Sequence, residues 1–146
     1  MMAKMIFVNL PVADVERASR FYEAVGARRD ERFSQEGVAA MLAFSKTIAF
    51  MLLSHARYAD FTTKRIVDAK AESEVLICLS ETTREGVDAT LAKALDAGAR
   101  ADPTPPQVMG DFMYGRSFED PDRHVIELMW MDVERAMAAW SGAGAA

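Results

Sequence analysis

Apolar and polar positions along the first half of the chain predict four strands and one helix. Residues 5–10, MIFVNL, form a short apolar run that stops at a proline, which suits a strand that leaves its sheet there. Apolar residues then recur at helical spacing over 15–25, between a candidate N-cap, Asp14, and a helix-ending Gly26. Three further strand candidates follow at about 28–34, at 38–45 around VAAMLAF and at 47–54 around TIAFMLLS.

The second half of the chain repeats this order of elements. A strand pattern, EVLICLS, covers residues 74–80, and a helical pattern follows from about Thr83 to Ala97. Gly98 ends this helix as Gly26 ends the first, and each glycine opens a Gly-Ala-Arg triplet. A proline-broken stretch at 103–107 precedes the last two strands, predicted at 112–118 and 124–131 with a turn at 120–123 between them.

A repeat of about 70 residues with the same element order indicates a tandem duplication. The predicted fold class is therefore α+β, with two β-α-β-β-β modules in a single domain over 1–146. The polar segment between the modules has no clear period and predicts a connector with room for a short helix. The predicted parts are module one at about 5–55, the connector at 56–73, module two at about 74–131, and a C-terminal helix and mobile tail at 132–146.

Composition and charge exclude some classes of protein but do not indicate a reaction. With 51% hydrophobic and 27% charged residues, the chain has the make-up of a soluble globular protein. No apolar run approaches the roughly 18 residues that cross a bilayer, and the N-terminus lacks the apolar core of a signal peptide. A net charge of −5 without a basic tract argues against nucleic acid as a partner. We therefore expect a cytoplasmic protein with neither membrane nor nucleic-acid partners.

The chain has one cysteine, Cys78, which excludes an internal disulfide. Its setting in VLICL predicts a small buried hydrophobe rather than a nucleophile, because a reactive cysteine needs an electropositive and partly exposed site.

Two segments carry a resemblance to a known family: LPVADVERASRFY at 10–22 and FEDPDRHVIE at 118–127. Together with the tandem modules, they resemble the vicinal oxygen chelate superfamily, which includes lactoylglutathione lyases, bleomycin- and fosfomycin-resistance proteins, methylmalonyl-CoA epimerase and extradiol dioxygenases. The resemblance covers residues 5–131 and implies curled mixed sheets that enclose a cavity. It leaves the chemistry open, since one scaffold hosts many reactions. Arg123 stands where the family's turn has Gly, so we expect a slightly different turn.

The resemblance also implies where a metal centre would lie. Metal-dependent members use a His on the first strand of each module, a Glu, Gln or His on the last strand of the first module, and a Glu on the last strand of the second. The last position is Glu127 here, but the others fall on Phe7, near Leu52 and near Leu76. Because a catalytic metal needs about three protein ligands, we predict no metal centre of the family type. If a divalent metal does bind, Glu127 is its ligand.

Glu127 then needs another explanation, because a carboxylate buried without a partner is strongly destabilising. Strand alternation puts it on one face with Val125 and Met129, while its immediate neighbours face the helices. Two interpretations stay open. Glu127 either pairs with a nearby arginine or meets water in the cavity, or it faces a substrate as a hydrogen-bond acceptor or general base.

Other polar residues are placed in the cavity by the same alternation. Arg116 alternates with Tyr114 and Phe118 on the strand expected to pair with that of Glu127. If these three face inward, Arg116 is the partner of Glu127 or of an anionic ligand, and Tyr114 can orient that ligand. An outward, solvated Arg116 is the alternative. On the first strand, Asn9 is expected in the cavity unless its side chain bonds to the strand's own end.

The predicted function is binding of a small, partly apolar molecule in an apolar cavity without the family metal centre. The alternative is a lyase or isomerase that uses Glu127 as acid and base, with or without a divalent metal. The sequence leaves open whether the protein is an enzyme, and it predicts a homodimer. Besides Glu127, the predicted ligand contacts are Phe7, Asn9, Leu52, Leu76, Tyr114, Arg116 and Met129.

Overall fold

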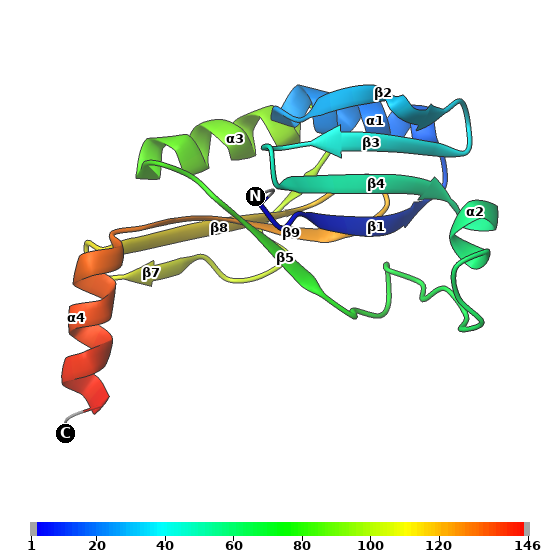
Figure 1. The fold of residues 1–146 in the computed structure, drawn as a ribbon. Coiled ribbons are helices and arrows are strands. Elements are labelled where there is room, and N and C mark those ends of the chain that lie inside the picture. The colour runs from blue at the N-terminus through cyan, green and yellow to red at the C-terminus, as the bar shows by residue number, and fades with distance from the viewer. Residues whose placement is uncertain (1–2, 145–146) are drawn as a thin grey trace. The chain divides into compact units, whose positions relative to one another are not determined.

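The elements follow one another in the order that the sequence pattern predicts, in a computed structural model that describes residues 3–144 (Figure 1). The chain divides into two units. The first contains the residues through Glu74 together with Pro121–Arg123, and the second contains Val75–Asp120 and the residues from His124 onward. Each unit has its own sheet, and each is described by itself.

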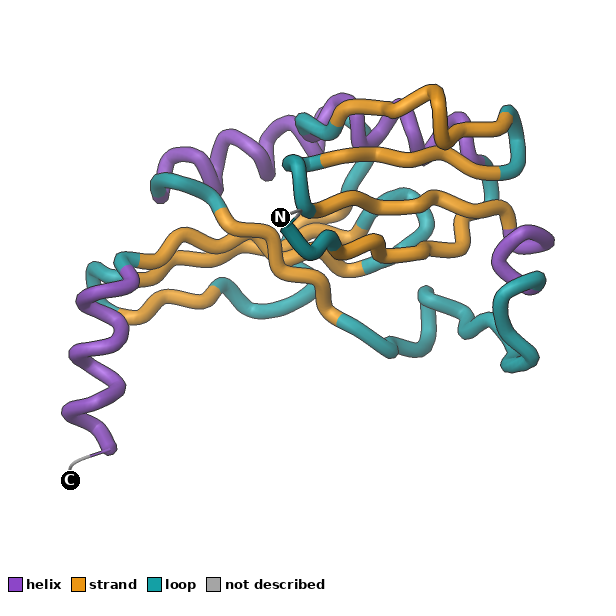
Figure 2. Tube along the Cα trace, in the orientation of Figure 1, coloured by secondary structure: helices purple, strands orange, loops and turns teal. Residues whose placement is uncertain are grey.

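The sheet of the first unit has four strands in the order β1-β4-β3-β2 (Figure 2). β1 runs parallel to β4, and the other pairs are antiparallel. β1 does not leave the sheet at Pro11, as expected from the sequence, but continues to Val12; a proline is tolerated there because β1 is an edge strand. The strands are β1 (Ile6–Val12), β2 (Arg28–Gln35), β3 (Ala39–Ala43) and β4 (Ile48–Ser54).

Helix α1 (Val15–Val25) covers one face of this sheet. Asp14 caps it by accepting a hydrogen bond from the N–H of Arg17, and Gly26 ends it with a φ of 116° that favours glycine. The ring of Tyr22 meets the edge of Phe50 at a centroid distance of 5.3 Å. Because Leu52 has the same strand parity as Phe50 and is fully buried, it also belongs to the face that α1 covers.

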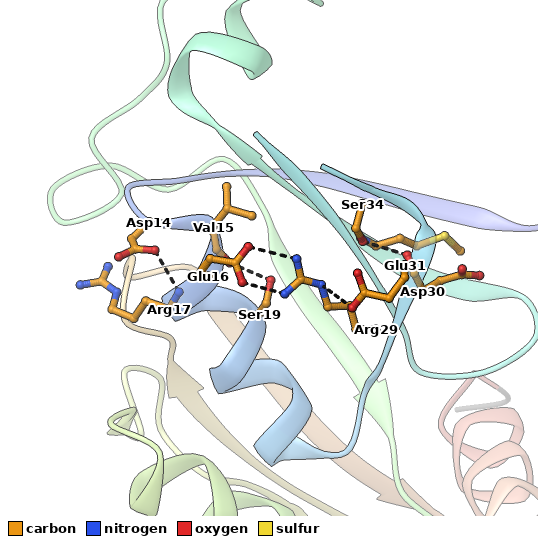
Figure 3. Close-up of polar contacts among 10 residues, drawn as sticks. Asp14, Val15, Glu16, Arg17, Ser19, Arg29, Asp30, Glu31 and Ser34 are labelled. Atoms are coloured by element: carbon orange, nitrogen blue, oxygen red, sulfur yellow. Dashed lines mark hydrogen bonds and ion pairs between the residues drawn. The ribbon is translucent and has the colours of Figure 1, made fainter. Parts of the chain in front are cut away.

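An ion pair ties α1 to β2 (Figure 3). The Arg29 guanidinium donates two hydrogen bonds to the Glu16 carboxylate, at 2.8 and 3.0 Å, and Glu31 lies 3.3 Å from its Nε. The pKa of Glu16 is lowered mainly by the hydrogen bond from Arg29. This contact fixes the edge strand to the helix on the first unit's outer side.

The connector begins with a short helix, α2 (His55–Ala59), for which Ser54 is the N-cap. The Ser54 hydroxyl accepts a hydrogen bond from the N–H of Arg57 at 3.1 Å. The short helix for which the sequence left room therefore lies at the start of this segment. No helix among residues 3–144 is both long and apolar enough to cross a membrane.

The sheet of the second unit has the order β5-β9-β8-β6, and β7 also pairs with β8. Its first and last strands, β5 and β9, are parallel, as β1 and β4 are in the first unit. Two short strands, β6 and β7, flank the stretch that the sequence showed only as proline-broken. The strands are β5 (Leu76–Ser80), β6 (Arg100–Ala101), β7 (Gln107–Met109), β8 (Met113–Glu119) and β9 (Val125–Met131).

Helix α3 (Arg84–Asp96) covers one face of this second sheet. Thr83 caps it by accepting from the N–H of Gly86, and its buried residues are Val87, Leu91 and Ala94. They pack with Phe118, Ile126 and Leu128, which are fully buried. The two modules therefore share one plan, and the predicted α+β fold class is confirmed; each sheet is open.

The C-terminal helix α4 (Val133–Gly144) runs further than expected. The sequence placed a tail from 141 onward, but the helix continues to Gly144, and residues 145–146 lie outside the described part. Asp132 caps the helix by accepting from the N–H of Arg135 at 3.1 Å. In Figures 1 and 2, α4 leaves the end of β9 and extends away from the sheet of its own unit.

The turn at 120–123 keeps the backbone shape that a glycine would take. Arg123 has a φ of 74°, so the expectation of a different turn is wrong: the arginine adopts the left-handed conformation itself. Within the second unit, the N–H of Asp120 donates to the His124 carbonyl, and the N–H of His124 donates back to the Asp120 carboxylate at 2.9 Å. These bonds close the turn and compensate for the strain.

Candidate functional site

The candidate site is a pocket in the second unit, on the sheet face opposite α3. Its volume is about 160 Å³. Strand pairing explains its floor, because Cys78 on β5, Glu127 on β9 and Ser117 on β8 lie directly opposite one another and so share a face. The lining residues are Cys78, Thr104, Pro105, Gln107, Met113, Gly115, Arg116, Glu127, Leu128 and Met129.

Glu127 is half-buried in this pocket. Its carboxylate has no hydrogen-bond or ion-pair partner within the part of the chain that the structure describes. The thioethers of Met113 and Met129 and the ring of Pro105 make much of the surrounding wall apolar. The Glu127 oxygens are not among the buried side-chain atoms that lack a hydrogen-bond partner, so they are open to solvent and free to accept hydrogen bonds from a ligand.

Cys78 lies beside Glu127 and differs from the sequence expectation. The residue is exposed rather than buried, because β5 is an edge strand. Local burial of the thiol, and to a lesser degree the negative charge of Glu127, raise the pKa of Cys78 above its usual value. A raised pKa disfavours the thiolate, which is the nucleophilic form of cysteine.

A loop after β6 forms the second wall of the pocket. The hydroxyls of Thr104 and Ser117 lie 2.8 Å apart, and the Thr104 N–H donates to the Ser117 hydroxyl at 3.3 Å. Two residues before Thr104, the N–H of Asp102 donates to the Ser117 carbonyl at 2.8 Å. Asp102 makes this bond with a strained φ of 50°. These bonds hold Thr104 and Pro105 over the face that carries Glu127.

Arg116 does not pair with Glu127, so of the two orientations that the sequence left open, the inward one is not adopted; nor is Arg116 simply solvated, because it pairs with acidic residues. Because Ser117 lies opposite Glu127, Arg116 points to the other face of β8. There its guanidinium donates two hydrogen bonds to Asp102, at 2.9 and 2.6 Å, and lies 3.7 Å from Asp88. The Arg116 hydrogen bond holds the pKa of Asp102 below its usual value.

Tyr114 also faces away from Glu127. Its hydroxyl donates to the Asp88 carboxylate at 2.6 Å, and the guanidinium of Arg84 lies 5.6 Å from the centre of its ring. Arg84 further lies 5.2 Å from the Trp130 ring and donates to the Gly110 carbonyl. Tyr114 and Arg116, which the sequence assigned to the cavity, therefore belong to a separate network on the α3 side.

The first-unit residues of the predicted site divide between two faces. Phe7 and Asn9 are exposed on the sheet face away from α1, but Leu52 lies on the covered face and is 0% exposed. Met51, which lies opposite Asn9, shares the open face instead. The sequence prediction of which β4 residue faces the open side was therefore wrong by one residue. An all-apolar strand gives no polar residue from which to tell its two faces apart.

In the second unit, the structure brings some predicted residues together and adds others. Met129 lines the pocket with Glu127, whereas Leu76 shares their face but lies outside the lining. Sequence reasoning missed Cys78, Met113 and the residues of the loop after β6. Cys78 could have been found, because it has the same parity as Leu76 on a strand parallel to β9. The loop residues carry no such periodic signal.

The donor set around Glu127 does not fit the family's divalent metal centre. Divalent metals of this kind need about three imidazole, carboxylate or thiolate ligands. Residues 3–144 contain no cluster of three or more His, Cys, Asp or Glu side chains able to hold one. Cys78 lies opposite Glu127 on the neighbouring strand, and these two side chains alone fall short of a three-ligand set. We therefore derive no chemical step through a metal.

The duplicated modules and the two sequence motifs define the class of protein to which the chain belongs. The sequence model of the Glyoxalase/Bleomycin resistance protein/Dioxygenase superfamily matches residues 4–128. The chain is therefore a member of this superfamily, and the predicted resemblance to the vicinal oxygen chelate group is confirmed. A comparison with curated proteins finds no match.

Solved structures with the same fold include both uncharacterised and named proteins. A hypothetical protein from S. aureus is 24% identical with a TM-score of 0.71, over 89% of this chain and 95% of that one. A family enzyme from Burkholderia phytofirmans is 22% identical with a TM-score of 0.68, over 87% and 98%. Lactoylglutathione lyase from Agrobacterium tumefaciens is 13% identical with a TM-score of 0.62, over 88% and 93%. At these identities the similarity establishes the fold alone.

Proposed function

We propose that the protein binds a small, partly apolar organic molecule at the Glu127 pocket, without a metal. The observation that carries this proposal is a half-buried carboxylate with no partner among the described residues, set among thioether and proline walls. Pockets of this composition, apolar with few polar groups, are typical of small-molecule sites. The volume of about 160 Å³ is close to that of a cavity that holds one benzene ring.

A lyase or isomerase is the second candidate function. The pairing of Glu127 with Cys78 favours it, because a carboxylate beside a protonated thiol provides one proton acceptor and one proton donor in the same pocket. In this alternative, Glu127 removes a proton from an acidic carbon of the substrate and returns it to a neighbouring atom. The Agrobacterium relative is a lactoylglutathione lyase, which makes this class of reaction the natural comparison.

We also propose that the protein is a homodimer. Helix α4 exposes Val133, Met137 and Trp140, which follow one another at helical spacing, with exposed fractions of 49–61%. A row of large apolar side chains on a helix that extends from its own sheet favours burial against another surface. A second copy of the chain presents the same row and can cover it in an isologous contact.

The first prediction concerns Glu127→Gln. This change removes the charge and keeps the shape, so we expect it to reduce the thermal stabilisation by ligands that donate hydrogen bonds to the carboxylate, while the melting temperature without ligand changes little. The measurement is a thermal-shift screen of small apolar amines, alcohols, acids and thiol adducts against both proteins. Glu134→Gln, an exposed neutralisation on α4, is the matched control. Equal stabilisation of wild type and Glu127→Gln would make Glu127 a structural residue.

A further inference from the structure

We propose that the Glu127 pocket selects ligands that carry a cationic amine on an apolar, ring-sized body, and that it rejects the matching carboxylates. This inference rests on the proposed small-molecule function and adds to it the charge of the ligand. It follows from which hydrogen-bonding groups in the pocket are already used and which remain.

The charge of the pocket is that of Glu127 alone. Arg116 is the one cationic residue among the described lining residues, and its guanidinium faces the opposite side of β8. There it is neutralised by Asp102 at 2.6 Å, with Asp88 at 3.7 Å. An anionic ligand would therefore meet a carboxylate without any compensating cation.

The hydrogen-bond donors of the pocket are also used. The Thr104 and Ser117 hydroxyls bond to each other at 2.8 Å, and the Gln107 side-chain amide donates to the Pro105 carbonyl at 2.9 Å. The donors that remain are the Cys78 thiol, which is weak, and the second N–H of the Gln107 amide. The pocket therefore offers mainly hydrogen-bond acceptors, above all the Glu127 carboxylate. The complementary ligand group has several donors and no acceptor, as an ammonium group does.

The walls define the rest of the ligand. Met113 and Met129 are flexible and polarisable, and their thioethers make favourable contacts with aromatic rings. Gly115 lines the pocket without a side chain, and a methyl group there would crowd the neighbouring strands, at 3.3 Å from the Leu128 carbonyl and 3.6 Å from the Cβ of Gln107. A single ring with a short aminoalkyl arm therefore fits the volume, the walls and the charge together.

Partial burial strengthens the charge preference. Fewer water molecules screen a half-buried carboxylate than an exposed one, so attraction to an ammonium and repulsion of a carboxylate both exceed their values in bulk water. The preference should consequently weaken as ionic strength rises.

The test compares three probes of one size: benzylamine, benzyl alcohol and benzoate, titrated by isothermal calorimetry into the full-length protein. We expect benzylamine to bind about tenfold or more tightly than benzoate, with benzyl alcohol between them. Glu127→Gln should weaken benzylamine about tenfold and change benzyl alcohol little. Glu127→Lys should reverse the order and favour benzoate. A melting curve for each variant without ligand establishes that it is folded.

The outcomes separate the charge preference from the proposed function. Benzoate binding as tightly as benzylamine to the wild type, or benzylamine affinity unchanged in Glu127→Gln, would overturn the charge preference and leave a small-molecule pocket in place. Binding of none of the three probes would overturn both. Loss of benzylamine binding alone in Glu127→Gln, with benzyl alcohol retained, supports the proposal as stated.

Discussion

Glu127 is the residue on which the proposed function rests, and its neighbour Cys78 offers a way to probe it. The two side chains lie opposite each other on parallel strands, and the carboxylate is one of two causes that raise the pKa of the thiol. The first cause is burial of the thiol itself. The reactivity of a natural cysteine can therefore measure the charge state of the pocket without any added label.

We predict that Glu127→Gln makes Cys78 easier to alkylate. Removing the negative charge lowers the pKa of the thiol, so more thiolate is present at a given pH and the rate with iodoacetamide rises, by about two- to fivefold at pH 8. Burial still holds the pKa above its usual value in the variant, so the rate should stay below that of a free thiol. Mass spectrometry of timed aliquots measures the rate, and Glu134→Gln is the control. An unchanged rate would show that the two side chains do not interact.

Residue-scale errors of the sequence prediction have one common cause. Alternation along a strand shows which residues share a face, but the register between strands decides which faces meet. Arg116 was expected beside Glu127, yet Ser117 is the residue opposite it. Leu52 was expected on the open face, yet Met51 occupies it. In each case a shift of one residue moves the side chain to the other side of the sheet.

At the scale of elements, the loop after β6 forms one wall of the pocket through Thr104 and Pro105. It is held from both sides of β8, by Arg116 through Asp102 and by Ser117 through Thr104. We interpret Arg116 as a positioning residue, because its guanidinium acts on the wall through Asp102 and does not itself face the pocket.

We predict that Asp102→Asn loosens this wall and weakens ligand binding by about three- to tenfold, with a small effect on the melting temperature because the pair is partly exposed. Hydrogen exchange at the Thr104 amide, followed by NMR, should become faster. Asp111→Asn, which removes the exposed pair with Arg135, is the matched control and should leave both unchanged. Normal exchange at Thr104 in Asp102→Asn would contradict a role of the pair in holding the loop.

The Arg116–Asp102 ion pair should also make the stability of the loop after β6 depend on pH, in a direction that follows from the pKa shift of Asp102. The pKa of Asp102 is lowered by Arg116, so the carboxylate stabilises the folded loop above its usual pKa of about 4. This contribution is lost as the pH falls from about 4 through the lowered folded-state value. Thr104 exchange, corrected for its intrinsic pH dependence, should therefore be constant from neutral pH to about pH 5 and accelerate below that range in the wild type alone.

Most elements were predictable because their signals are local. Asp14 and Gly26 bracket α1, and Thr83 and Gly98 do the same for α3, so caps and helical spacing were sufficient. β6 and β7 were missed because two- and three-residue strands are too short to show alternation. The predicted end of β1 came too early because the prediction used Pro11 as its boundary. A proline is tolerated on an edge strand, where its missing N–H need not face a neighbouring strand.

At the scale of the whole molecule, the two modules have the same order of elements, but their open sheet faces carry different polar side chains. The open face of the first sheet carries Phe7, Asn9 and Met51, while that of the second carries Glu127 and Cys78. The superfamily and the α+β fold were readable from the motifs and the repeat. The ligand was not, because the motif that contains Glu127 is shared by proteins with different chemistries.

We predict a dimer at micromolar concentration. Sedimentation equilibrium should give about twice the chain mass of 16.1 kDa, because the apolar row on α4 is otherwise exposed to water. Met137→Asp should shift the mass toward the monomer, whereas Ala138→Asp, on the neighbouring side of the same helix, should not. A wild-type mass near that of one chain would contradict the dimer.

The central claim is that Glu127 serves an organic ligand and not a metal. Elemental analysis of protein purified without chelators tests it most directly, with wild type and Glu127→Gln prepared side by side. We predict far less than one equivalent of Zn, Ni, Mn or Fe per chain in both, because residues 3–144 contain no group of three or more His, Cys, Asp or Glu side chains that could hold a metal. A stoichiometric metal in the wild type that is lost in Glu127→Gln would contradict the claim.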